Sequence, residues 1–279
     1  LTSPSKPAAD AGSSPAGGPA LLLLALSKKD GTLLWEAELD TGNKMRNKQN
    51  DSSPSPVTDG EHVWAVTGTG TVAALTMNGE IIWKHNLQTE YSPFGLNFGY
   101  ASSPLLFEGK LIVQVLHGLK TDAPSYVMAF DALSGAALWH VERPSDAILE
   151  SRDAYTTPVL LRHEGKAQII VSGGDYVTAH DPDTGQEVWR AGGLNPGGSK
   201  KNRIIVSPVA VDGMVYACSS RRPFLAIRAG GTGDITTSHL AWKWDYDGPD
   251  VPTPACDGTY LYLVDDRGTI VCFNAKTGE

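Results

Sequence analysis

The feature of this sequence that most constrains its fold is a turn-and-tryptophan element that recurs along the chain. In four copies a glycine stands four residues before a tryptophan. These pairs are Gly31 and Trp35, Gly79 and Trp83, Gly135 and Trp139, and Gly185 and Trp189. A short apolar run precedes each glycine, such as residues 127–130 ahead of Gly135. Because an apolar run, a glycine turn and a second strand form a β-hairpin, the element predicts one hairpin per copy.

A second element alternates strictly with the first. It consists of Ser or Thr before Pro, then apolar residues, then a glycine that leads into another strand. Its copies begin at Ser55-Pro56, Ser103-Pro104, Thr157-Pro158, Ser207-Pro208 and Thr253-Pro254, and their glycines are Gly60, Gly109, Gly165, Gly213 and Gly258. Proline is tolerated at the start of a strand, where its missing N–H need not pair.

Together the two elements define one repeating unit of four strands. Strand A follows the Ser/Thr-Pro pair, strand B follows the first glycine, and strands C and D flank the second glycine and end at the tryptophan. The prolines are spaced 48, 54, 50 and 46 residues apart. A period of about 40 to 50 residues with four strands per unit is typical of β-propellers. We therefore expect an all-β fold, a β-propeller of four-stranded antiparallel blades with about five to six blades present.

Composition narrows the function classes. The chain has 279 residues, of which 41% are hydrophobic, and a formal net charge of -8, so it lacks the basic field of a nucleic-acid binder. Its longest apolar run, residues 20–26, is far shorter than the roughly 20 residues of a membrane-spanning helix. Three widely spaced cysteines indicate neither a disulfide framework nor a thiolate zinc site, and the seven histidines are scattered singly.

Two local motifs suggest chemistry that the repeat does not support. Residues 68–73 fit the dinucleotide pattern Gly-x-Gly-x-x-Ala, but their phase in the repeat predicts a turn between strands B and C. Residues 181–185 superficially suggest a calcium loop, yet they fall at a turn between strands C and D. We interpret both as hairpin turns.

Counting strands along the repeat predicts the domain organisation. Residues 20–279 form a single propeller domain with strands C and D of one blade, four complete blades, and strands A to C of a last blade. The opening strand C is then surplus to a closed ring, which favours a fragment of a larger ring. Residues 1–19 are rich in Ser, Pro, Ala and Gly and are expected to be flexible. Residues 21–26 resemble the apolar core of a signal peptide, but their register favours strand C, so no signal peptide is expected here.

The repeat resembles that of the pyrroloquinoline quinone (PQQ) type propellers, whose docking motif reads Ala-x-Asp-x-x-Thr-Gly-x-x-x-Trp. Two copies match well, at residues 129–139 and 179–189, and a fifth copy at residues 226–242 carries an insertion over 230–238. The resemblance covers residues 20–279. It implies that the tryptophan of each copy packs between neighbouring blades. These structural docking residues are Trp35, Trp83, Trp139, Trp189 and Trp242.

The order of segments is similar to that of secreted PQQ-binding-like propeller proteins of bacteria, with the outer-membrane assembly lipoprotein and the quinoprotein alcohol dehydrogenases as more distant relatives. This resemblance implies a non-catalytic scaffold, periplasmic or extracellular, for a protein, peptide or glycan partner, with no cofactor. The alternative is a PQQ- and calcium-dependent dehydrogenase or a degenerate relative. Because the alcohol-type dehydrogenases carry an adjacent Cys-Cys pair that this chain lacks, we favour the scaffold over an enzyme and assign no catalytic, cofactor or metal residue.

Candidate binding residues follow from the expected topology. In a propeller, strand A lines the central channel, and the loops joining D to A and B to C open on one face. The polar and aromatic residues just before each strand A are therefore the best candidates for a binding site at the channel mouth. They are Asn50, Asp51, Tyr100, Arg152, Asp153, Tyr155, Asn202, Arg203 and Asp250. At any single position, an ordinary loop residue is the simpler interpretation.

Overall fold

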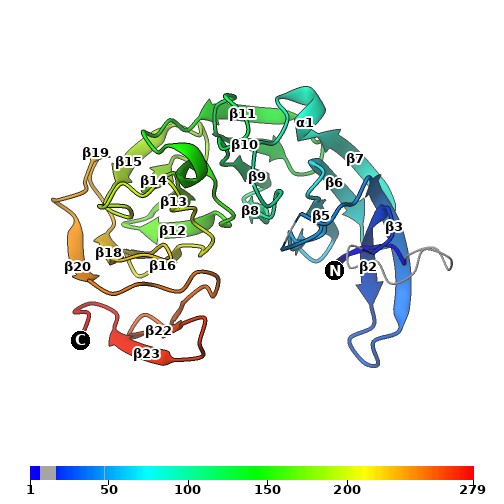
Figure 1. Cartoon of the computed structure of the whole chain (residues 1–279). Coiled ribbons are helices and arrows are strands. Elements are labelled where there is room, and N and C mark those ends of the chain that lie inside the picture. Colours follow the sequence, from blue (N-terminus) through cyan, green and yellow to red (C-terminus); the bar gives the residue numbers. More distant parts are fainter. Residues whose placement is uncertain (7–16, 47) are drawn as a thin grey trace. The chain divides into compact units, whose positions relative to one another are not determined.

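The fold is built almost entirely from β-strands, as a computed structural model shows for residues 1–6, 17–46 and 48–279 (Figure 1). The strands in chain order are β1 (Thr2–Pro4), β2 (Ala20–Leu26), β3 (Leu33–Thr41), β4 (Val57–Thr58), β5 (His62–Val66), β6 (Thr71–Thr76), β7 (Ile81–Asn86), β8 (Leu105–Phe107), β9 (Lys110–Val115), β10 (Tyr126–Asp131), β11 (Ala137–Glu142), β12 (Val159–His163), β13 (Lys166–Gly173), β14 (Tyr176–His180), β15 (Glu187–Ala191), β16 (Val209–Val211), β17 (Met214–Ala217), β18 (Phe224–Arg228), β19 (Gly233–Asp234), β20 (Leu240–Trp244), β21 (Ala255–Cys256), β22 (Tyr260–Val264) and β23 (Ile270–Asn274). Helix α1 (Leu87–Glu90) and a 3₁₀ turn (Leu149–Arg152) are each four residues long.

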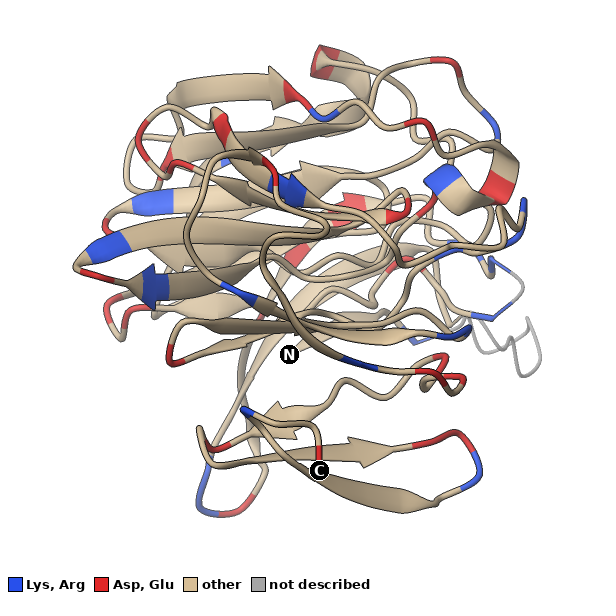
Figure 2. Ribbon diagram, turned by 90° about the vertical axis from the view of Figure 1, so that its left-hand side faces the viewer, with Lys and Arg blue, Asp and Glu red and all other residues tan. Residues whose placement is uncertain are grey.

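The strands form successive sheets in which chain neighbours pair. Three sheets have four strands, in the orders β4-β5-β6-β7, β11-β10-β9-β8 and β16-β17-β18-β20. One has five strands, β12-β13-β14-β15-β19, and two have three strands, β1-β2-β3 and β21-β22-β23. The antiparallel order confirms the predicted A-B-C-D unit, with each Ser/Thr-Pro pair preceding the first strand of a sheet. Acidic and basic residues lie mostly in the turns and loops that join the strands (Figure 2).

The chain divides into two compact units, each with its own core. The first comprises residues 1–115, 120–123 and 128–138, and the second comprises residues 116–119, 124–127 and 139–279. In the first unit, Leu23 and Leu39 of one sheet join Ala65 and Leu75 of the next in a buried cluster. In the second unit, a cluster joins residues of β17 and β18 to residues of β22 and β23. Each core therefore lies between consecutive sheets, where burial of apolar side chains holds one sheet on the next.

The start of the chain differs from its prediction. Residues 1–19 were expected to be flexible, but Thr2–Pro4 form β1, which pairs antiparallel with β2 in the register Thr2↔Leu23. The hydroxyl of Thr2 donates hydrogen bonds to the carbonyls of Ser52 (2.9 Å) and Pro54 (2.7 Å). The prediction was wrong there because a three-residue polar strand has no apolar pattern, and its stability comes from backbone pairing. Residues 7–16 of the predicted flexible segment lie outside the described residues.

Because β1 occupies the place of a strand B, the first sheet has three strands where two were expected. The proposal that the chain belongs to a larger ring stays a prediction.

The insertion at residues 230–238 also has a structural role that the sequence does not predict. Within it, β19 pairs in parallel with β15, in the register Trp189↔Gly233 and Arg190↔Asp234. The N–H of Ile235 then donates to the carbonyl of Arg190 at 2.9 Å, and the Ile235 side chain is buried. The insertion thus covers the outer edge of β15, an edge that would otherwise present unpaired backbone groups.

The turns between strands C and D explain the Asp, Ser/Thr and Gly of the repeat. The Asp131 carboxylate accepts hydrogen bonds from the N–H (2.7 Å) and hydroxyl (2.7 Å) of Ser134. Gly135, at φ 75°, then donates its N–H to the carbonyl of Asp131 at 2.9 Å. Asp181 forms the same turn with Thr184 and Gly185, which confirms that residues 181–185 are a hairpin turn. Residues 68–70 likewise join β5 to β6 as predicted.

Candidate functional site

The C–D turns bring consecutive sheets into close contact through the repeat tryptophans. At four turn glycines, an added Cβ would lie 2.5 to 2.8 Å from the indole ring of a tryptophan in the preceding sheet. These glycine and tryptophan pairs are Gly79 on Trp35, Gly135 on Trp83, Gly185 on Trp139, and Gly278 on Trp242. A real Cβ does not fit at that distance, so glycine is required for the approach as well as for its positive φ.

Each of these indoles also donates a hydrogen bond to the turn that covers it. The acceptors are the carbonyls of Met77 for Trp35 (2.8 Å), Ala132 for Trp83 (2.9 Å), Pro182 for Trp139 (3.0 Å) and Ala275 for Trp242 (3.0 Å). Trp189 differs, because the insertion at residues 230–238 interrupts the copy that follows it. Its indole donates to the side chain of Gln168 in its own sheet at 3.0 Å.

Three predicted channel-mouth residues lie in the first compact unit, and they hold its loops together. The buried Asp51 carboxylate accepts hydrogen bonds from the N–H of Lys44 (2.9 Å) and from Nε of Arg46 (3.2 Å). The buried Tyr100 hydroxyl donates to the carbonyl of Gln114 at 3.0 Å. Asn50 is half-buried, and its side chain accepts from Ser52. These contacts order the loops that precede strand A.

Six predicted residues lie in the second unit, and most of them also make contacts within loops. The buried Asp153 carboxylate accepts from the N–H groups of residues 118 and 119 at 3.0 and 3.1 Å. Arg152 donates through Nε to the carbonyl of residue 147 at 3.0 Å. The buried Asn202 donates to the carbonyl of residue 194 at 3.2 Å. Tyr155 is also buried, and its N–H donates to the carbonyl of residue 204 at 2.8 Å.

The remaining two, Arg203 and Asp250, form an ion pair at 3.4 Å. That the nine residues bind a ligand stays a prediction.

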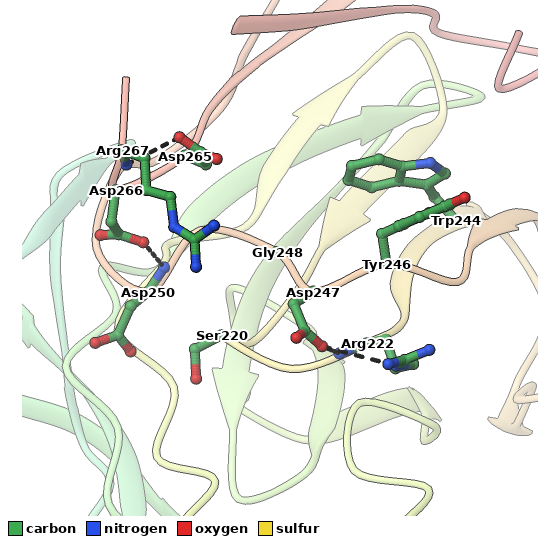
Figure 3. A pocket seen from close by; sticks show the side chains of 10 residues that line it. All are labelled: Ser220, Arg222, Trp244, Tyr246, Asp247, Gly248, Asp250, Asp265, Asp266 and Arg267. Carbon is green, nitrogen blue, oxygen red and sulfur yellow. Dashed lines mark hydrogen bonds and ion pairs between the residues drawn. The ribbon is translucent and has the colours of Figure 1, made fainter. Parts of the chain in front are cut away.

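Asp250 lies at a cavity of about 550 Å³ (Figure 3), and the sequence did not predict this cavity. The cavity forms where the loop after β20 meets the turn between β17 and β18 and the turn between β22 and β23. Its lining residues are Ser220, Arg222, Trp244, Tyr246, Asp247, Gly248, Asp250, Asp265, Asp266 and Arg267. These are a D–A loop and two B–C turns, the loop types expected to open on one face of the propeller.

Two aromatic rings form one side of this cavity. Trp244 and Tyr246 have ring centroids 4.9 Å apart at an interplanar angle of 34°. Trp244 is fixed from behind by Phe273, whose ring meets it edge-on at 5.1 Å. Tyr246 is 64% exposed. The two rings thus form an apolar surface whose position is held by the contact of Trp244 with Phe273.

Carboxylates and guanidinium groups form the other sides. Asp247 accepts a hydrogen bond from the N–H of Arg222 at 3.0 Å and lies 3.8 Å from its Nε. Asp266 accepts from the N–H of Asp250 at 2.6 Å. Asp265 accepts from the N–H groups of Thr269 (2.8 Å) and Arg267 (2.9 Å) in its own turn. These bonds lower the pKa of Asp265 below its usual value, because they stabilise the ionised carboxylate.

The loop after β20 is held tightly at Gly248. A Cβ at this position would lie 2.7 Å from the carbonyl oxygen of Ser219 and 3.1 Å from the side chain of Cys218. The backbone therefore passes close to the end of β17, which sets the position of Asp247 and Asp250 on the cavity rim.

Of these lining residues, only Asp250 is among the binding residues predicted from the sequence, because those candidates all lie just before a strand A. The signal that was available is the pattern Trp244-x-Tyr246-Asp247, an aromatic pair with an acid directly after a strand D.

The alternative prediction, a quinone held with calcium, requires a group of carboxylate or other donor side chains. Within the described ranges, no group of three or more His, Cys, Asp or Glu side chains is gathered as a metal ion requires. The three cysteines are free, with Cys218 buried, Cys256 half-buried and Cys272 exposed. We therefore derive no reaction step through PQQ. In the same part of the chain, no helix is long and apolar enough to cross a membrane.

Two of the curated proteins that are similar to this chain are both named outer membrane protein assembly factor BamB. The protein of Yersinia pestis is 22% identical over 264 residues, which cover 92% of this chain and 60% of the relative. That of Bordetella pertussis is 23% identical over 251 residues, which cover 88% of this chain and 55% of the relative. The chain thus spans less than two thirds of the length of either relative.

Comparison with solved structures confirms a β-propeller fold. BamB from Moraxella catarrhalis matches with a TM-score of 0.64 at 17% identity, covering 94% of this chain and 71% of that one. The quinohemoprotein alcohol dehydrogenase ADHIIG from Pseudomonas putida matches with a TM-score of 0.52 at 18% identity, covering 81% and 41%. A family model described as outer membrane protein assembly factor BamB matches residues 2–279, and the chain therefore belongs to this family.

Proposed function

We propose that the protein is a non-catalytic scaffold that acts in the periplasm in the assembly of outer membrane proteins. The observation that carries the proposal is the family match over residues 2–279. Two relatives from different bacteria bear the name of an outer membrane protein assembly factor. We propose a periplasmic rather than an extracellular location, because the names of both relatives tie them to assembly of the outer membrane.

The construction of the fold supports a scaffold. Tryptophans, turn glycines and indole hydrogen bonds fix four of the sheets on the sheet that follows, so the loops at their ends lie on a rigid support. The cavity combines the exposed Tyr246 and the half-buried Trp244 with arginines, and these three residue types most often dominate protein interfaces. We therefore propose protein or peptide partners ahead of a glycan, with the cavity as one contact region.

The enzyme alternative rests on a more local similarity. Quinohemoprotein alcohol dehydrogenase ADH-IIG is 30% identical over 125 residues, which cover 40% of this chain and 15% of that protein. The donor set described above gives that segment no calcium site among the described residues. We therefore propose no cofactor.

Genetic complementation tests the scaffold proposal. The full chain is expressed with an export signal in bacteria that lack their own BamB, and the amounts of outer membrane β-barrel proteins are measured. We expect partial or full restoration, and an unchanged defect despite normal periplasmic levels would contradict the proposal.

Calorimetric titration of the same protein with PQQ, with and without calcium, tests the enzyme alternative. No heat is expected, whereas saturable calcium-dependent binding would favour the quinoprotein.

A further inference from the structure

The cavity at Trp244 and Tyr246 has a composition that selects among partners. Its volume of about 550 Å³ lies within the range of about 300 to 1,000 Å³ of sites that enclose a small ligand or a few side chains. It is formed by three separate loops and turns, so it can admit a side chain from solvent without movement of a strand. All of its lining residues belong to the second compact unit.

Its aromatic side is available to a ligand. Tyr246 is 64% exposed and forms no hydrogen bond with another described residue. Trp244 lies between Tyr246 and Phe273, so its ring orientation is fixed before a ligand arrives. Exposed aromatic faces attract cations through the ring quadrupole, and they also cover aliphatic stems. A Lys or Arg side chain has both a cation and a stem.

Its charge favours the same ligand. Four aspartates line the cavity against two arginines, in a chain of net charge -8. Asp265 and Asp266 form no ion pair with another described residue, while backbone N–H groups hold their carboxylates in place. The side chains of Asp247 and Arg222 are about two-thirds exposed and 3.8 Å apart, so their ion pair contributes little stability. A charged ligand can therefore replace Arg222 as the partner of Asp247. Asp250 is already paired with Arg203 at 3.4 Å, so an anionic ligand would be repelled mainly by Asp265 and Asp266.

Arg267 is the cation that a basic ligand would have to accommodate. Its side chain extends into the cavity (Figure 3) and forms no hydrogen bond with a described residue. A guanidinium group carries five donors and no acceptor, so it suits the backbone carbonyls of an extended peptide. Arg267 is therefore placed to bind the main chain of a segment whose side chain reaches the aromatic rings.

We propose that this cavity binds an extended peptide segment of a partner protein through one of its Lys or Arg side chains. The side chain lies on Trp244 and Tyr246 with its charge near Asp266. This inference rests on the proposed scaffold function and names the chemistry of its partner.

Fluorescence anisotropy with labelled peptides tests the inference on the full chain. The probe is a flexible peptide of alternating Gly and Lys with three lysines, and the reference probe has Glu in place of each Lys. We expect the Lys probe to bind at least about tenfold more tightly than the Glu probe at low salt, because Asp265 and Asp266 attract a cation and repel an anion. Binding should weaken as salt rises.

Two variants and two matched controls locate the site. Tyr246→Ala removes the exposed ring, and Asp266→Asn removes a charge while it keeps an oxygen for the N–H of Asp250. Each should weaken the Lys probe about two- to fivefold, the value of one exposed cation–π contact or one charge pair. The controls, Tyr262→Ala and Asp257→Asn, change an exposed tyrosine and a turn-capping aspartate elsewhere on the β21-β22-β23 sheet. They should leave the affinity unchanged.

Equal affinity for the two probes, or equal losses in variants and controls, would overturn the inference. Calorimetric binding of a neutral chitin trisaccharide, with no binding of the Lys probe, would also overturn it and indicate a glycan site. None of these results bears on complementation of outer membrane protein levels, so the scaffold proposal and this inference fail separately. Thermal unfolding of each variant shows whether it is folded.

Discussion

Replacing Gly135 by alanine tests whether close docking of a C–D turn on a tryptophan stabilises the fold. Gly135 has φ 75°, and a Cβ there would lie 2.7 Å from Cδ2 of Trp83. Alanine therefore meets two penalties, one from the backbone conformation and one from the ring. A matched position separates them. Gly31 has φ 74° and closes the same type of turn, but an added Cβ finds nothing within 4 Å.

The two penalties have different sizes. A left-handed conformation costs an L-residue about 1 to 2 kcal/mol relative to glycine, which applies to both variants. Overpacking against a fixed ring adds about 1 to 3 kcal/mol, which applies to Gly135→Ala alone. We expect Gly31→Ala to lose about 1 to 2 kcal/mol of unfolding free energy and Gly135→Ala about 2 to 5 kcal/mol. If Trp83 shifts to relieve the contact, its hydrogen bond to Ala132 lengthens, and that loss of about 1 kcal/mol falls within the same range.

Urea unfolding followed by far-ultraviolet circular dichroism measures both variants beside the parent protein. Tryptophan fluorescence in the same samples reports whether Trp83 changes its environment only in Gly135→Ala. Equal losses of free energy in the two variants would refute the reasoning, since the ring contact would then contribute nothing beyond the backbone term. A larger loss in Gly31→Ala would refute it more strongly.

Two further predictions concern buried titratable groups. His180 is buried, and burial lowers its pKa from 6.5 to about 4, so the folded protein keeps it neutral, with Nδ1 donating to Gly185 and Nε2 accepting from Thr178. The unfolding free energy that neutral His180 contributes is therefore fully present above pH 6.5. Up to about 3 kcal/mol of it is lost as the pH falls to about 4. Urea unfolding at pH 7 and pH 4.5 should show a smaller loss of unfolding free energy on acidification in His180→Asn than in the parent protein. Cys272 is exposed, whereas Cys218 is buried and burial raises the pKa of its thiol. A maleimide should therefore label Cys272 in the folded protein and Cys218 only after unfolding. Mass spectrometry of the modified peptides measures both.

The sequence predicts the repeat well because each of its signals is local. Asp131, Ser134 and Gly135 lie within five residues, and they form the turn through contacts with one another. Short apolar runs similarly specify strands that pair with their chain neighbours. Strands β1 and β19 escaped prediction for the opposite reason. They are short and polar or glycine-containing, and they exist because a longer strand, β2 or β15, offers them an unpaired edge.

The candidate site is predictable only in part because burial decides which polar residues can meet a ligand. Asp51, Asp153 and Asn202 precede their strands A as predicted, yet each is buried and satisfies loop backbone or side-chain groups. Asp250, in a later copy of the same region, lies at a cavity because the aromatic loop after β20 and the turn at residues 265–267 leave space beside it.

Equivalent positions in a repeat thus diverge according to the loops that surround them. Internal repetition can therefore predict where the loops of a propeller lie, while the binding that we propose depends on the composition of one of those loops. In this chain that loop is the segment from Trp244 to Asp250, and variants within it separate binding from folding most directly.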